Sequence, residues 1–149
     1  EARDGRQEAR EAEQEARDRR QEARDAEFHA AMFRTMDHSF DLLAYIEVED
    51  GVSRRLWSSA SYQTVLGHDP AECLGDEVTL THLNTPFFLE SQLPHLIDEY
   101  MSGKLVNGFV IEAPFLHAGG HEVPFEHRMA RDSDDSHRFF LISRELTDR

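Results

Sequence analysis

Residues Trp57–Gly75 read W-S-S-A-S-Y-Q-T-V-L-G-H-D-P-A-E-C-L-G and predict two short helices with a stop between them. Ser59 can cap the first helix, and Gly67 can end it, because glycine readily adopts the left-handed conformation that closes a helix. Asp69 can cap the second helix, with Pro70 at its first position. Helices this short do not form alone, since the first helical turn costs free energy. We therefore expect both to pack against a sheet.

Segments with strand character lie on both sides of these short helices. Alternating apolar positions within 42–48 predict a half-buried strand, and an Asp-Gly pair at 50–51 predicts a hairpin turn after it. The predicted elements, in chain order, are strands at 42–48 and 52–58, the two short helices, a helix at 93–102, and strands at 106–116, 122–131 and 138–146. This order predicts an α+β fold, in which a five-stranded antiparallel sheet carries short helices on one face.

The N-terminal residues form a separate, highly charged segment. Residues 2–29 repeat with a period of fourteen, which is two heptads, and their composition favours one long helix. We expect this helix to pair in a homodimer, with candidate contacts at Ala12, Ala26, Phe28, Met32, Phe33 and Met36. A seam rich in alanine buries little area, so a solvated single helix or linker is the alternative. The expected division is residues 1–32 for the helix and 33–149 for the folded domain.

Charge and cysteine content narrow the classes of partner and location. The chain carries 30 acidic and 16 basic residues, a net charge of −14, which disfavours nucleic acid and anionic membranes as partners. One lysine among sixteen basic residues fits either a salt-adapted source or a biased genome. The single cysteine, Cys73, excludes an internal disulfide and fits a cytoplasmic location. No apolar run approaches the length of a membrane span.

Two motifs at a wide separation point to one family. The first comprises Trp57, Ser59, Tyr62, Leu66, Gly67, His68, Pro70, Glu72, Leu74 and Gly75, and the second closes the chain as Glu145-Leu146-Thr147-Asp148-Arg149. Together they resemble PAS domains, in which an Asn-x-x-aromatic turn, Leu-Gly-Tyr and Pro-Glu-Glu-Leu-x-Gly precede a closing Asp-Ile-Thr-Glu-Arg. Ser59, His68 and Glu145 replace the commonest residues of that pattern. The resemblance covers residues 33–149.

This resemblance implies a sensory module of a bacterial or archaeal signal-transduction protein, such as a two-component system, and not an enzyme. Such a module binds a small ligand or a partner and relays the change through flanking helices in a dimer. The resemblance places the relay at Glu145 and Thr147. It also implies a downstream effector in the same chain, such as a histidine kinase or a cyclase, so we expect this sequence to be part of a longer protein.

A ligand pocket, if present, would lie between the inner face of the sheet and the helices. The inward-pointing candidates are Ile46, Tyr62, Leu66, Leu96, Ile97, Phe109, Ile111, Phe125, His127 and Leu141. Plain core is the alternative for every one of them. His127 is the one polar member, and a core histidine held by a hydrogen bond is the simplest interpretation.

The cofactor signals are weak. The nine histidines show no metal-binding spacing, and a solvated loop is the favoured interpretation of His117 and His121. A haem ligand on the longer helix would be His95, which the helical period turns toward water, so the haem hypothesis depends on His127. The Cys motif of flavin-binding relatives is absent, which disfavours flavin, and we interpret Cys73 as a small buried hydrophobe. No serine has a partnered base in the sequence pattern, so we expect no catalytic residues.

Three functions remain open at this point: a ligand-binding sensor, a ligand-free module for dimerisation or docking, and a haem-binding gas or redox sensor. Dimer dissociation measured with and without residues 1–27 separates the first two. A visible absorption spectrum after haem addition tests the third.

Overall fold

The computed structural model describes residues 2–36, 41–105, 108–132 and 137–146. The chain divides into two compact units, Glu1–Thr35 and Met36–Arg149, which are described separately. The boundary expected between residues 32 and 33 lies inside the first helix. No helix in the described part of the chain combines the length and the apolar character needed to cross a membrane.

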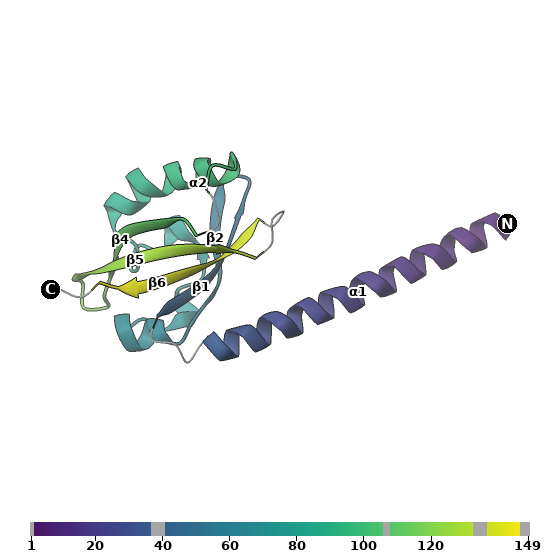
Figure 1. The fold of residues 1–149 in the computed structure, drawn as a ribbon, viewed down its shortest axis with the longest axis horizontal. Coiled ribbons are helices and arrows are strands. Elements are labelled where there is room, and N and C mark those ends of the chain that lie inside the picture. Colours follow the sequence, from purple (N-terminus) through teal and green to yellow (C-terminus); the bar gives the residue numbers. More distant parts are fainter. Residues whose placement is uncertain (1, 37–40, 106–107, 133–136, 147–149) are drawn as a thin grey trace. The chain divides into compact units, whose positions relative to one another are not determined.

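The first unit is the helix α1, Ala2–Met36, shown in purple and blue in Figure 1. Its surface carries pairs one turn apart, such as Gln7 with Glu11 at 3.0 Å and Gln14 with Asp18 at 2.8 Å, which support a helix that buries little. Ala12 and Ala26 are exposed on it. Phe28, Met32, Phe33 and Met36 lie on α1, but their side chains fall outside the described set.

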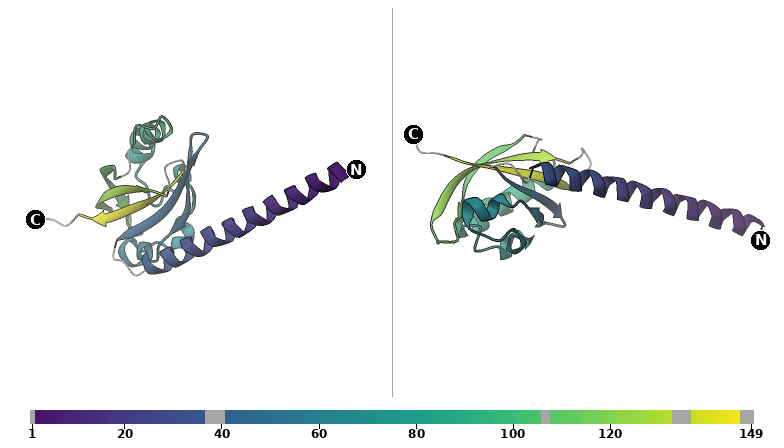
Figure 2. Two further views of the ribbon diagram at one scale, coloured as in Figure 1. Left: turned by 45° about the vertical axis from the view of Figure 1, so that its right-hand side comes forward. Right: turned by 90° about the horizontal axis from the view of Figure 1, so that it is seen from below.

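The second unit is built on a six-stranded antiparallel sheet with the order β3-β2-β1-β6-β5-β4 (Figures 1 and 2). The strands are β1 Leu42–Glu49, β2 Val52–Ser58, β3 Gly75–Asp76, β4 Val110–Leu116, β5 Glu122–Arg131 and β6 Arg138–Glu145. The prediction of five strands was therefore one short. The extra strand is β3, where Gly75 does not end a helix but begins two extended residues that pair with Arg54 and Arg55.

The central strand β1 is more buried than its sequence suggested. Leu42–Ile46 are all buried, so the expectation of a half-buried strand was wrong. β1 lies between β2 and β6, and Tyr45 on the outer face stacks against Phe140 with ring centroids 4.8 Å apart. The predicted turn after β1 is confirmed, since Asp50 and Gly51 both adopt positive φ angles, of 53° and 75°.

The two capped turns are present as short helices: η1, Tyr62–Leu66, one π-helical turn, and η2, Pro70–Glu72. Gly67 ends η1 with φ 77°, and the Asp69 side chain accepts a hydrogen bond from the Ala71 N–H, as predicted. Ser59 does not cap η1. Its hydroxyl accepts a hydrogen bond from the Leu43 N–H at 3.0 Å, which ties this turn to β1.

The longer helix begins earlier than predicted. Helical conformation starts at Pro86, continues through the π-helical turn η4, Phe88–Gln92, and ends as α2, Leu93–Met101. The Thr85 hydroxyl accepts the Phe88 N–H at 3.2 Å and caps this start. Pro94 has no N–H to donate, and the wider turn before it accommodates that loss.

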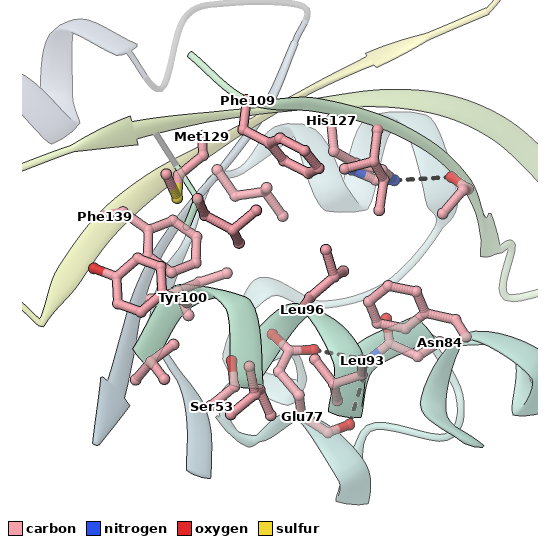
Figure 3. A pocket seen from close by; sticks show the side chains of 18 of the residues that line it. Ser53, Glu77, Asn84, Leu93, Leu96, Tyr100, Phe109, His127, Met129 and Phe139 are labelled. Atoms are coloured by element: carbon pink, nitrogen blue, oxygen red, sulfur yellow. Dashed lines mark hydrogen bonds between the residues drawn. The ribbon is translucent and has the colours of Figure 1, made fainter. Parts of the chain in front are cut away.

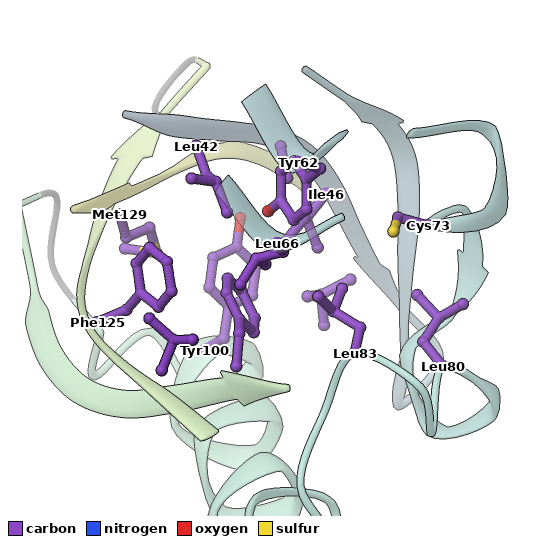
Figure 4. Close-up of a cluster of buried hydrophobic side chains, with 14 of the residues drawn as sticks. Leu42, Ile46, Tyr62, Leu66, Cys73, Leu80, Leu83, Tyr100, Phe125 and Met129 are labelled. Atoms are coloured by element: carbon purple, nitrogen blue, oxygen red, sulfur yellow. The ribbon is translucent and has the colours of Figure 1, made fainter. Parts of the chain in front are cut away.

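The hydrophobic core fills the space between the inner face of the sheet and the helices (Figure 4). Tyr62 and Leu66 from η1 and Phe125 from β5 have no exposed surface. The short helix η3, Glu77–Thr79, and the residues that follow it add Leu80 and Leu83. The turns that could not be stable alone are thus held by burial against the sheet.

Candidate ligand pocket

A pocket of about 100 Å³ lies between the inner face of the sheet and α2 (Figure 3). Its wall is mostly aliphatic and aromatic. Seven of the ten predicted pocket residues line it: Ile46, Leu96, Ile97, Phe109, Ile111, His127 and Leu141. The other three, Tyr62, Leu66 and Phe125, are fully buried core residues that do not line the pocket.

A buried ion pair forms part of the wall. Nε of Arg55 on β2 lies 2.5 Å from Oε1 of Glu77 on η3, and both residues are only 3% exposed. Burial alone would lower the pKa of the Arg55 guanidinium, but the carboxylate of Glu77 and the phenol of Tyr62 outweigh it, so the pKa is raised. The Arg55 guanidinium therefore stays charged, and the Glu77 carboxylate in contact with it offsets that charge.

Hydrogen bonds extend this ion pair in two directions. Arg55 Nη1 donates to the Tyr62 hydroxyl at 2.5 Å, and its Cζ lies 5.3 Å from the centre of the Tyr62 ring. Burial raises the pKa of Tyr62, so the phenol stays protonated although the charge of Arg55 opposes the shift. Asn84 Nδ2 donates to Oε2 of Glu77 at 2.7 Å. The network therefore joins β2 to η1, to η3 and to the segment before α2.

His127 contributes the other polar part of the wall, from the inner face of β5. Its Nε2 lies 2.8 Å from the Ala113 carbonyl and its Nδ1 lies 2.7 Å from the Ser143 hydroxyl. Because a carbonyl only accepts, Nε2 carries the proton and the Ser143 hydroxyl donates to Nδ1. Burial lowers the pKa of His127 to about 4, although the bond to Ala113 opposes the shift. The ring is thus neutral at pH 7.

Several wall residues were missed by the sequence analysis, above all Ser53, Arg55 and Glu77. Charged side chains usually lie on the solvent side of a strand. The alternation of residue types along β2 does not indicate that Arg55 faces the core. The reason is a bulge, since Trp57 pairs with Tyr45 but Arg55 pairs with Ile46. One extra residue reverses the facing of the positions before it, so Arg55 points inward.

The architecture matches solved structures of one family. The PAS domain of an HTR-like protein from Haloarcula marismortui superposes with a TM-score of 0.60 at 22% identity, covering 86% of this chain and 99% of that one. The PAS domain of the fruit-fly ELK potassium channel gives 0.59 at 14% identity, with 81% and 98% covered. This chain has a PAS fold.

A further solved structure agrees on the fold. An RNA-binding light-oxygen-voltage receptor gives a TM-score of 0.63 at 11% identity, covering 82% of this chain and 34% of that one. No protein-family model and no curated protein matches the sequence. At these identities, the shared property is the PAS fold itself.

Haem does not fit the pocket of this PAS fold. Pockets for drug-sized ligands span roughly 300–1,000 Å³. The pocket here measures about 100 Å³, which is far smaller than the volume of a tetrapyrrole. Both ring nitrogens of His127 already have partners. His95 lies on the exposed side of α2, as predicted, where its Nε2 is 2.8 Å from a carboxylate oxygen of Glu99.

His117, His121 and Cys73 are the other residues that the sequence analysis weighed as cofactor ligands. His117 and His121 stack beside the β4–β5 turn with ring centroids 4.5 Å apart. Within the described ranges, no three His, Cys, Asp or Glu side chains come together as they would around a metal ion. Cys73 is fully buried, as predicted, and burial raises the pKa of its thiol to about 11. It is therefore protonated at neutral pH.

Ser58, Ser59, Ser61 and Ser143 have local hydrogen-bond partners. The Ser58 hydroxyl donates to the Cys73 carbonyl, and Ser59 and Ser61 share a hydrogen bond at 2.6 Å. Ser143 contacts His127 but has no exposed surface, and an imidazole with a pKa near 4 is a weak base at neutral pH. This pair is suited to holding β5 and β6 in register.

Of the two proposed relay residues, Glu145 is the last residue of β6. Glu145 is exposed and pairs across the sheet with Phe125 of β5. Thr147 lies outside the described residues.

Proposed function

We propose that this chain is the sensory module of a signal-transduction protein, and that it responds to a small molecule bound between the sheet and α2. The observation that carries the proposal is the pocket, which has a mainly apolar wall with a few buried polar groups, the usual composition of a ligand site. Solved structures with the same fold include a domain of a sensory box sensor histidine kinase/response regulator and a PAS domain of a two-component sensor histidine kinase.

In the proposed mechanism, the ligand changes the packing of α2 against β5 and β6. Leu96 and Ile97 of α2 face His127 and Leu141 of the sheet across the pocket. A ligand there would shift the strands. The conformational change would be transmitted through the segments that flank the domain in the chain, α1 before it and Glu145 and Thr147 after it. The effector, a kinase or a cyclase, would follow in the same polypeptide, inside the cell.

Native mass spectrometry of the purified chain tests this proposal directly. We expect a bound small molecule, and we expect its mass to be absent from the variant Ala113→Leu, which fills the pocket from β4. A chain that carries no small molecule, and that no small molecule stabilises against heat, would contradict the sensory proposal.

The second candidate is a ligand-free dimerisation module, and α1 is the observation that favours it. The described side chains of this helix within 5–30 are exposed, apart from the half-buried Ala16, so its heptad positions at Ala12 and Ala26 are available to a partner helix. We propose a homodimer through α1 in either case. Sedimentation with and without residues 1–27 measures this contribution, and dimerisation that is unchanged by the deletion would exclude α1 as the interface.

A further inference from the structure

The charged groups on the pocket wall cancel one another. Arg55 and Glu77 contact each other directly at 2.5 Å, and no other charged residue in the described part of the domain lines the pocket. His127 adds no charge, because its ring is buried and neutral at pH 7. Both of its ring nitrogens are engaged in hydrogen bonds. A ligand that brings its own charge into this space would leave that charge without a counter-ion, which is costly in a buried site.

Two hydrogen-bond donors on β2 are left for a ligand. The Ser53 hydroxyl and Nη2 of Arg55 have no hydrogen-bond partner among the described residues, although Ser53 is only 5% exposed and Arg55 only 3%. Both residues line the pocket, and Figure 3 shows Ser53 among the side chains around it. Every side-chain N or O atom that is fully buried in the described part of the chain has a partner, so these two are not sealed in the core.

The volume limits the size of the ligand. An apolar cavity of roughly 150 Å³ accepts benzene, and this pocket measures about 100 Å³. The ligand is therefore about the size of benzene or smaller. Its apolar part would contact aliphatic and aromatic side chains such as Leu96, Phe109 and Met129, which make up most of the wall.

We propose that the pocket selects a small, uncharged molecule that has an apolar body and a single hydrogen-bond-accepting oxygen, held by Ser53 and Arg55. This inference rests on the proposed sensory function and specifies the chemical class that it senses. A ketone or a compact alcohol has the required chemistry. A carboxylate of the same shape would face Glu77, and an ammonium ion would face Arg55.

Three molecules of nearly identical shape test this selection. They are 3-methyl-2-butanone, which is neutral and has one accepting oxygen, isobutyrate, which is an anion, and 2,3-dimethylbutane, which has no polar atom. The full chain, labelled with ¹³C at the methionine methyl groups, would be titrated with each of them. Met129 lines the pocket and reports binding, while Met101 is 55% exposed and is the internal control.

We expect the ketone to shift the Met129 signal with an affinity at least about tenfold above that of isobutyrate, because the anion has no counter-ion in the pocket. The hydrocarbon should bind about fivefold more weakly than the ketone, for want of one hydrogen bond. Ser53→Ala should remove most of the ketone's advantage without weakening the hydrocarbon. Ser102→Ala, at an exposed position after α2, is the matched control and should change neither.

The outcomes separate the two levels of the proposal. If isobutyrate binds as tightly as the ketone, the inferred selection is wrong, although the pocket remains a ligand site. If Ser53→Ala weakens all three probes equally, the hydroxyl is not a ligand contact. If no probe shifts the Met129 signal of the folded, unsubstituted chain, then the pocket does not bind small molecules and the sensory function fails with it.

Discussion

Removing one member of the Arg55–Glu77 pair should destabilise the PAS domain far more than replacing both. Glu77→Ala would leave the Arg55 guanidinium, which is 3% exposed, buried without its carboxylate. Breaking a buried ion pair in this way costs about 3–5 kcal/mol. The loss of the hydrogen bond between Glu77 and Asn84 adds about 1 kcal/mol. This total is a large part of the roughly 5–15 kcal/mol by which a domain is stable.

The double variant Arg55→Met with Glu77→Leu removes both charges and keeps apolar bulk in their place. Tyr62 and Asn84 each lose a partner, which costs about 1 kcal/mol per group. We therefore expect a net destabilisation of about 2 kcal/mol, well below that of Glu77→Ala alone. The free-energy coupling between the two positions should exceed about 2 kcal/mol.

Urea unfolding followed by the fluorescence of the single tryptophan, Trp57, measures these differences. Glu126→Ala is the matched control, since Glu126 lies 4.0 Å from Arg128 in an exposed pair and should cost less than about 1 kcal/mol. The reasoning is refuted if Glu77→Ala costs no more than Glu126→Ala, or if the double variant loses as much as its own single variants, Arg55→Met and Glu77→Leu, lose together.

Three further outcomes follow from the same structure. By NMR, the His127 ring should titrate near pH 4 rather than near 6.5, and a titration near 6.5 would exclude the burial seen here. Because the unfolded histidine takes up its proton at the higher pH, acid should destabilise the fold progressively from about pH 6.5 down to 4. Gly67→Ala should lower the thermal stability more than Gly103→Ala. Both glycines have similar positive φ angles, but only at Gly67 would the new Cβ lie 3.1 Å from the Cβ of Ala118, so equal losses of stability would contradict that contact. Native Cys73 should resist iodoacetamide until urea unfolds the domain, because its thiol is buried and protonated at neutral pH, so rapid labelling of the folded chain would count against its position in the core.

Local chemistry explains why so much of the fold could be predicted from the sequence. Gly67 and Asp69 act over a few residues, and so does the turn at Asp50, so their roles depend little on the rest of the chain. The helix before Pro94 was missed although its signal was present. Thr85 and Pro86 form a cap and a first position, but Pro94 inside the helix also fits a first turn and favours a start at residue 93.

The pocket was only partly predictable, for a reason that concerns register. Residues of β4, β5 and β6 alternate without interruption, so the inward direction of Ile111, His127 and Leu141 could be read from one strand at a time. On β2 the facing of Arg55 depends on a bulge opposite Tyr45 and Ile46, which is a property of two paired strands. Polar pocket residues placed by long-range pairing therefore lie beyond what periodicity in one segment can indicate.

The network around Arg55 also gives the proposed sensing a physical basis. Arg55 contacts Tyr62 in η1 and Glu77 in η3, and Asn84 pairs with both Glu77 and, through its backbone, Phe115 of β4. A ligand oxygen that accepts from Arg55 would therefore act on the group that holds the short helices to the sheet. A ligand at a hundred times its dissociation constant stabilises the fold by about 2.7 kcal/mol, which is comparable to the expected coupling between Arg55 and Glu77. Occupancy of a pocket this small could thus change how firmly the helices are held, without any large movement of the domain.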